Sequence, residues 1–197
     1  MNFTNIPETA FTSYTIENIT FNYSGPYATI GDPNGPSQGM QYVAPKWLTG
    51  HAGGTLTMTF AQPVFALGFG FALNGEPGTT ITNAINISLI DQNSVLASST
   101  TLDASSVSWT PEGRFDFNGA NAIQSASVTF RSDFPFHAWD PMFGIDNVSY
   151  AITPIPEPSA YAMAAGAISL LYVVRVRRKL QALGSKPNMG QAEDVRL

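Results

Sequence analysis

Cysteine is absent from the 197 residues, and cations are scarce, with nine Lys and Arg against fourteen Asp and Glu. Without cysteine the chain forms neither disulfides nor thiolate metal sites, so its stability must come from packing and sheet hydrogen bonds. Only three cations, Lys46, Arg114 and Arg131, precede residue 154, where eleven acidic residues bring the net charge to −8. Because phosphate binding depends on clustered Lys and Arg, we expect no nucleic-acid partner.

One uncharged apolar run, residues 160–174, lies near the C-terminus and predicts an apolar helix with no polar face. The prolines before it, Pro154, Pro156 and Pro158, fix φ and remove N–H donors, so they predict an extended spacer. At about 1.5 Å per residue the helix spans about 22 Å. The hydrocarbon core of a membrane is roughly 30 Å thick, so the residues on either side of the helix must cover the remaining distance. The basic cluster 175–179 marks the cytoplasmic side. These features predict a single C-terminal transmembrane helix, with residues 1–153 outside.

The order of these features resembles the PEP-CTERM sorting signal of Gram-negative bacteria that secrete exopolysaccharide. The resemblance covers residues 154–179 and implies that Pro156, Glu157 and Pro158 are the recognition motif. It implies a processing partner, the membrane-embedded, transpeptidase-like enzyme exosortase, which reads the signal and releases the protein outward. It also implies a membrane stop formed by Arg175, Arg177, Arg178 and Lys179.

The two ends of the chain leave alternatives open. Residues 180–197 continue past the basic cluster as a polar tail, which we expect to be disordered and cytoplasmic. Residues 1–9 lack the basic and apolar segments of a secretory signal peptide, so either the true start lies upstream or the copy is truncated. An unprocessed anchor in membrane lipid, or a buried C-terminal helix, would explain the apolar run without sorting.

Before residue 154, short runs alternate apolar and polar residues between turn formers, as half-buried strands do. Phase slips at Glu17-Asn18 and at Asp146-Asn147 predict β-bulges, and Pro63 interrupts one run. Residues 25–54 are rich in Gly, Pro, Ser and Asn and predict one long connection. We expect an all-β domain, an antiparallel β-sandwich, with strands at residues 55–60, 65–71, 85–89, 95–102, 114–118, 126–130 and 143–150. Before them, residues 14–23 form either one long bent strand or two short strands, 14–16 and 19–23.

Three of these strands resemble those of the jelly-roll ectodomains often attached to PEP-CTERM signals. One follows Gly53-Gly54, one follows Pro63, and the third is the closing strand from Phe143. Such jelly rolls are similar to lectins and carbohydrate-binding modules, so the resemblance implies a jelly-roll-like, lectin-like sandwich.

In similar jelly rolls an Asp of the closing strand often binds Ca²⁺, a cation that takes six to eight oxygen ligands. This implies a calcium site at Asp146, with Asp140 and loop carbonyls nearby. Alternatively, Asp146 and Asn147 stabilise the bulge by bonding local backbone N–H groups. We expect no other cofactor.

Loop aromatics are the candidates for carbohydrate binding. A pyranose ring stacks its apolar face on Trp or Tyr, while Asn and Asp bond its hydroxyls. The predicted loops contain Tyr42, Trp47 and Trp139. Alternatively, these aromatics fold inward and plug the ends of the sandwich.

Catalytic patterns are weak. A Gly-x-Ser-x-Gly pattern surrounds Ser37, but prolines flank it and no helix follows, so a hydrolase with His51 or His137 as base lacks its structural context. We therefore expect no enzyme. The sequence predicts an exported protein of the cell surface or exopolysaccharide matrix, with a structural or adhesive role. The alternatives are a module that binds extracellular polysaccharide and, second, the Ser37 hydrolase.

Overall fold

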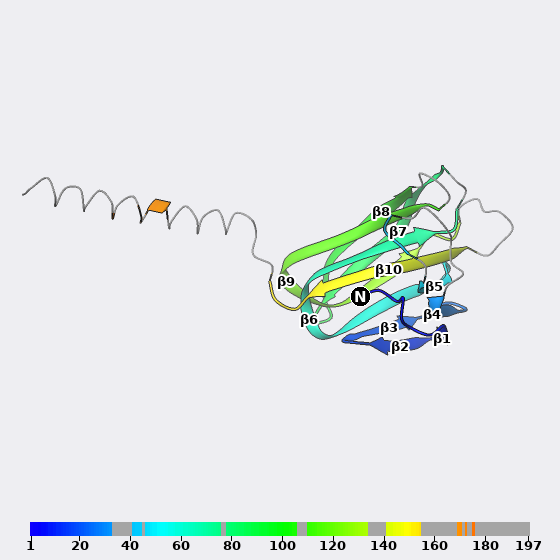
Figure 1. Ribbon diagram of the computed structural model, residues 1–197, viewed down its shortest axis with the longest axis horizontal. Helices are drawn as coiled ribbons and strands as arrows, with labels where there is room; N and C mark the ends of the chain where they lie inside the picture. The colour runs from blue at the N-terminus through cyan, green and yellow to red at the C-terminus, as the bar shows by residue number, and fades with distance from the viewer. Residues whose placement is uncertain are drawn as a thin grey trace, which may run out of the picture. The chain divides into compact units, whose positions relative to one another are not determined.

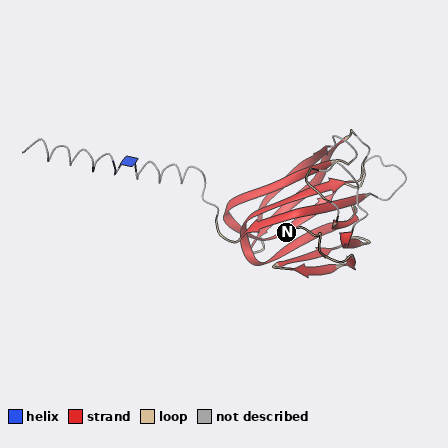
Figure 2. Cartoon of the chain, in the orientation of Figure 1, coloured by secondary structure: helices blue, strands red, loops and turns tan. Residues whose placement is uncertain are grey.

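The computed structural model describes residues 1–32, 41–44, 46–75, 78–105, 110–133 and 141–154, and also Ser169, Leu170, Tyr172 and Arg175. Contacts within the chain define two units, Met1–Ile155 and Pro156–Leu197. The described part of the first unit is all-β and antiparallel, which confirms the predicted fold class at that level (Figure 1, Figure 2).

Most of the predicted apolar helix 160–174 lies outside the described residues. Ser169, Leu170 and Tyr172 within it, and Arg175 after it, are helical and exposed. Within the described part of the chain, no helix is both long and apolar enough to cross a membrane. Also outside the described residues are Pro156, Glu157, Pro158, Arg177, Arg178, Lys179 and the tail 180–197.

The described residues form ten strands in one antiparallel sheet. The strand order is β1-β4-β5-β10-β6-β9-β7-β8, with β3 paired to β6 and β2 paired to β3. The strands are β1 (Thr9–Phe11), β2 (Ser13–Ile16), β3 (Ile19–Tyr23), β4 (Ala28–Asp32), β5 (Trp47–His51), β6 (Thr55–Leu73), β7 (Thr80–Asp91), β8 (Leu96–Ser105), β9 (Glu112–Phe130) and β10 (Met142–Ala151).

Two long strands, β6 and β9, pass from one half of this sheet to the other, and each has 19 residues. The first part of β6 pairs with β3 and with residues 125–129 of β9. The last part pairs with β10 and with residues 112–118 of β9. Register shifts between Thr59, Val64 and Ala66 separate the two parts. The sheet folds over at these bends.

Aromatic contacts join the two halves of the folded sheet across the core. Phe130 at the end of β9 stacks on Phe143 of β10 with ring centroids 3.9 Å apart. Tyr23 of β3 contacts the same Phe143 at 5.5 Å, and Phe60 of β6 contacts Tyr150 of β10 at 6.0 Å. Each pair links strands of opposite halves, which is the face-to-face packing of a β-sandwich.

The structure corrects three local predictions. Glu17 and Asn18 form a hairpin turn rather than a bulge, because Ile16 of β2 pairs with Ile19 of β3, and this confirms the alternative of two short strands. Pro63 does not end a strand, since it lies within a register shift of β6 where the ladder does not need its missing N–H. The predicted connection 25–54 contains the two short strands β4 and β5.

Other local predictions are confirmed. β3, β7, β8 and β10 contain the strands expected at residues 19–23, 85–89, 95–102 and 143–150 to within a residue. The slip at Asp146-Asn147 is a register irregularity of β10, and Asn147 has a φ of 53° there. The runs 114–118 and 126–130 belong to the single strand β9.

Candidate functional site

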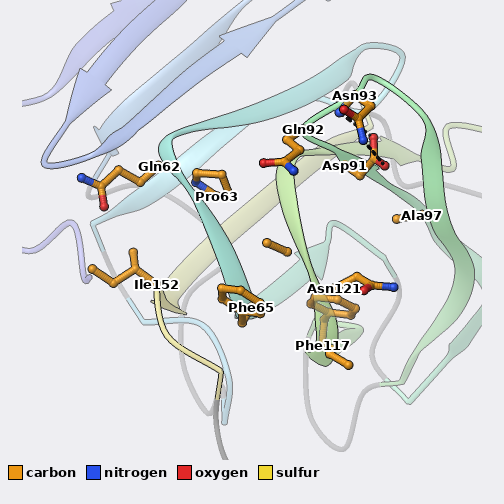
Figure 3. Close-up of a pocket in the computed structure, with 13 residues that line it drawn as sticks. Gln62, Pro63, Phe65, Asp91, Gln92, Asn93, Ala97, Phe117, Asn121 and Ile152 are labelled. Atoms are coloured by element: carbon orange, nitrogen blue, oxygen red, sulfur yellow. Dashed lines mark hydrogen bonds between the residues drawn. The ribbon is translucent and has the colours of Figure 1, made fainter.

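A hollow of about 820 Å³ lies where β6 and β9 bend, beside the turn between β7 and β8 (Figure 3). We call it the bend hollow. Thirteen described residues line it: Gln62, Pro63, Phe65, Asp91, Gln92, Asn93, Ala97, Phe117, Gly119, Ala120, Asn121, Ala122 and Ile152. Its volume falls within the roughly 300–1,000 Å³ typical of small-molecule sites.

The bends create this hollow because both strands lose regular pairing there. Val64 and Ile123 are the only paired residues between the two regular stretches of the β6–β9 ladder. A Cβ at Gly119 would lie 2.4 Å from Cζ of Phe117, so a larger residue there would have to displace the ring. The Phe117 ring therefore lies against the backbone of its own strand.

Two half-buried rings, Phe65 from β6 and Phe117 from β9, give the hollow an aromatic wall (Figure 3). Ile152, just after β10, adds an apolar side chain that is 52% exposed. Phe117 also packs against the core, which holds its ring in place. A half-exposed aromatic wall on a sheet suits a flat, partly apolar ligand surface.

Uncharged amides surround this wall. Gln62, Gln92 and Asn121 are exposed, and their side chains make no hydrogen bond within the described part of the chain. The Asn93 side chain already has a partner, because its Nδ2 donates a hydrogen bond to Asp91 Oδ2 at 3.4 Å (Figure 3). Three amide groups are thus available to a ligand, each with two donors and an acceptor.

Asp91 is the one charged side chain among the lining residues, and it shapes the β7–β8 turn. Its Oδ1 accepts hydrogen bonds from the backbone N–H groups of Val95 and Asn93, both at 2.8 Å. These hydrogen bonds hold the pKa of the Asp91 carboxyl below its usual value. Asp91 is therefore an ionised turn residue, poorly suited to act as a general base near neutral pH.

The described lining offers binding groups without catalytic ones. It contains no Ser, Thr, Cys, Lys or His, and its single carboxylate is bound to the turn. Across the described residues, no cluster of three or more His, Cys, Asp or Glu side chains is placed to hold a metal ion. The arrangement can therefore hold a ligand by stacking and by hydrogen bonds to neutral amides.

The predicted carbohydrate-binding aromatics lie elsewhere. Trp47 is fully buried in a small cluster with Val43 and Ala72, so its ring offers no face to a sugar. The prediction that Trp47 binds carbohydrate is therefore wrong. Its ring passes over Gly144, where a Cβ would lie 3.0 Å from Cε3. The inward-folded alternative applies to this residue.

Tyr42 is half-buried against the same cluster. Its N–H donates to Glu112 Oε2 at 2.8 Å, and its carbonyl accepts from Asn147 Nδ2 at 2.9 Å. The segment that carries Tyr42 is thereby fixed on the outer surface of β6 and β10. Trp139, Ser37 and His137 lie outside the described residues.

Asp146 is 2% exposed, and burial raises the pKa of its carboxyl. Oδ2 accepts from the N–H of Ala44 at 3.1 Å, whereas Oδ1 has no hydrogen-bond partner. A calcium ion needs six to eight oxygen ligands, and Asp146 belongs to no group of three or more acidic, His or Cys side chains placed to hold a metal ion among the described residues. They do not by themselves fit Ca²⁺, and Asp140 lies outside the described residues.

Sequence reasoning missed Phe65, Phe117 and Asn121 as site residues. Phe65 and Phe117 both sit in alternating runs, and alternation alone assigns every large residue to the core. Two residues in the sequence could have indicated that these rings lie at a bend. Pro63 and Gly119 are unfavourable inside strands and mark the bends at which the rings become exposed.

No protein-family model matches the chain, and no curated protein matches it. Among solved structures, CBM29_1, a family 29 carbohydrate-binding module from Piromyces equi, is 8% identical over 68% of this chain and 92% of that chain, with a TM-score of 0.34. TmCBM61, solved in complex with β-1,4-galactotriose, is 11% identical over 76% of this chain and 97% of that chain, with a TM-score of 0.30.

The enzymatically active domain of tailspike protein 4 from bacteriophage CBA120 is a further structural match. It is 13% identical over 76% of this chain, which spans only 20% of that chain, with a TM-score of 0.31. At such TM-scores the likeness assigns neither a fold nor a ligand to this chain.

Proposed function

We propose that this protein is a non-catalytic carbohydrate-binding module whose ligand site is the bend hollow. The observation that carries the proposal is the pairing of two half-buried rings, Phe65 and Phe117, with three amides that have no internal partner. A pyranose presents one apolar face and a rim of hydroxyls. The rings stack on that face while the amides bond the rim.

The site's composition also favours binding over turnover. Glycoside hydrolysis uses a pair of carboxyl groups on either side of the scissile bond. Asp91 is the one carboxyl group in the described lining, and its Oδ1 already accepts hydrogen bonds from two backbone N–H groups of the β7–β8 turn. The expectation of a protein without enzymatic activity remains part of the proposal.

Affinity gel electrophoresis of the full chain in gels that contain a neutral soluble polysaccharide tests this function. We expect retardation by at least one polysaccharide of a panel. Asn121→Ala should weaken the affinity by about two- to tenfold, the effect of one net hydrogen bond. Asn22→Ala is the matched control, since Asn22 is an exposed amide of β3 outside the hollow.

Retardation by no polysaccharide, or equal loss in both asparagine variants, would remove the hollow as the site. Circular dichroism of each variant separates a lost contact from a lost fold. A competing loop site at Trp139 predicts instead that Trp139→Ala abolishes retardation while Asn121→Ala leaves it unchanged.

Outward delivery by the C-terminal signal is a second proposal, and it rests on the sequence alone. The order of Pro156-Glu157-Pro158, the apolar run and the basic cluster supports it. Intact mass spectrometry of the native protein by cell fraction tests it. A secreted species ending near residues 156–159 is expected, whereas a membrane-bound species ending at Leu197 would make the segment a plain anchor.

A further inference from the structure

Away from the bend hollow, the outer face of one half of the sheet carries a regular set of hydroxyl groups. Paired residues of neighbouring strands lie on one face of a sheet, and so do residues two apart along a strand. The pairings of β2, β3, β6, β9, β7 and β8 therefore place one row of residues across six strands. This middle row consists of Ser13, Asn22, Thr57, Ser127, Ser88 and Ser99.

Two further rows lie on the same face, each two residues from the middle row along the strands. One consists of Thr15, Thr20, Thr59, Ser125 and Ile90. The other consists of Thr55, Thr129, Asn86 and Thr101. We call the three rows together the hydroxyl face. All its positions carry a hydroxyl group except Asn22, Asn86 and Ile90.

The hydroxyl face is accessible and its side chains are held in place. Each of its residues is half-buried or exposed, whereas the residues between them, such as Leu56 and Val128, are buried in the core. Hydrogen bonds join neighbouring strands, with Oγ1 of Thr57 3.3 Å from Oγ of Ser127. Because threonine is also stiff at χ1, little side-chain freedom is left to lose when a ligand binds.

The residues that this face lacks restrict its ligand. None of its positions is charged, so it has no cation for a phosphate or an acidic polymer. None is aromatic, so no ring is present on which a sugar could stack. Trp, Tyr and Arg, which anchor most protein interfaces, are likewise missing, and Ser and Thr contribute little there. The face is a neutral grid of hydroxyl groups and suits another grid of donors and acceptors.

The spacing of this grid follows from the sheet. Neighbouring strands lie about 4.8 Å apart, and every second residue recurs after about 6.6 Å along a strand. Oxygen atoms in ice repeat over similar distances in two directions, and each of them both donates and accepts hydrogen bonds, as a hydroxyl group does. Neighbouring strands twist by roughly 20–25°, so a flat crystal plane can meet only a few strands at once. The central strands β3, β6 and β9 therefore carry the contact.

We propose that the hydroxyl face binds ice, with Thr57, Thr59 and Ser127 at the centre of the contact. Their hydroxyl groups take the positions of water molecules at the crystal surface, and the bound protein stops the crystal from growing there. The inference goes beyond the proposed function and does not depend on it, because no residue of the hydroxyl face lines the bend hollow.

Microscopy of ice recrystallisation in a frozen sucrose solution tests the proposal with the full chain. We expect the wild type to suppress crystal growth and Thr57→Lys to lose this effect, because a long charged side chain keeps the neighbouring hydroxyl groups from the crystal. Thr129→Lys should lose it too, and the fold should tolerate this change because Thr129 is exposed. Circular dichroism checks that each variant is folded.

Ser98→Lys is the matched control, because Ser98 is an exposed residue of β8 that points to the opposite face from its neighbour Ser99. This variant should suppress crystal growth as the wild type does. Absence of suppression by the folded wild type would overturn the proposal. Equal suppression by the wild type, Thr57→Lys and Thr129→Lys, or equal loss in Ser98→Lys, would exclude the hydroxyl face as the ice-binding surface.

Sedimentation with crystalline cellulose or chitin powder tests a solid of another class. We expect no sedimentation that depends on Thr57. Sedimentation of the wild type that Thr57→Lys removes, without suppression of ice growth, would overturn ice as the ligand and assign the face to crystalline polysaccharide.

Discussion

Replacing Gly70 by Ala should detach a segment that the structure fixes to the outer face of the sheet. An added Cβ at Gly70 would lie 2.0 Å from the carbonyl oxygen of Tyr42, far inside van der Waals contact. That oxygen belongs to residues 41–44, which cover the buried cluster around Trp47. Backbone rather than a flexible side chain meets the new methyl, so the segment must move.

The expected cost follows from the hydrogen bonds that hold this segment. Tyr42 accepts from Asn147 at 2.9 Å, and Glu112 accepts from the N–H groups of Gln41 and Tyr42 at 2.6 and 2.8 Å. A neutral hydrogen bond contributes about 0.5–1.5 kcal/mol and one to a charged group about 1.5–3 kcal/mol. Losing the first and weakening the other two should lower the free energy of unfolding by about 2–4 kcal/mol.

Gly68→Ala is the matched control on the same face of the same strand. The three atoms nearest to a Cβ there are side-chain ends, Asp116 Oδ1 at 2.7 Å, Arg114 Nη2 at 3.0 Å and Ser149 Oγ at 3.0 Å, and each of these can move aside. Urea unfolding followed by tryptophan fluorescence measures both variants. Equal midpoints for Gly70→Ala and Gly68→Ala would refute the reasoning, as would a wild-type midpoint for Gly70→Ala.

Three further predictions concern single buried groups. Burial raises the folded-state pKa of Asp146 above 3.8, so the free energy of unfolding should increase as pH falls through that pKa. Urea titrations at a series of pH values should show this increase in the wild type and not in Asp146→Asn. Burial raises the pKa of Tyr23 to about 12 from 10.0, so ultraviolet titration should find a late-titrating tyrosine that is absent in Tyr23→Phe. The free energy of unfolding should fall as pH rises from 10.0 to about 12. Phe143→Ala should lower the free energy of unfolding by about 3–5 kcal/mol in the same urea assay, because Phe143 is 1% exposed and stacks on Phe130. A decrease below about 1 kcal/mol would contradict the role of Phe143 in the core.

The class of fold was predictable because alternation of apolar and polar residues is local. The run ending at Phe130 and the run from Phe143 each read as strands without knowledge of their partners. The continuation of β6 through Pro63 was not predictable, since it depends on which backbone groups a neighbouring strand leaves unpaired.

The candidate site was less accessible to sequence reasoning. Trp47 looked like an exposed loop aromatic, but β5 and the segment 41–44 bury it. Phe65 and Phe117 looked like core residues, but they are half-buried and line the hollow where β6 and β9 bend. Exposure of a side chain is set by packing between distant segments, and one sequence does not specify that.

The most direct test of the central claim is a ¹⁵N–¹H NMR titration of the full chain with a neutral oligosaccharide that binds in the gel assay. Side-chain amide signals report the bend hollow without mutation. We predict that the signals of Gln62, Gln92 and Asn121 shift on binding while that of Asn22 does not. Shifts confined to other residues, with these three amides unchanged, would contradict the account.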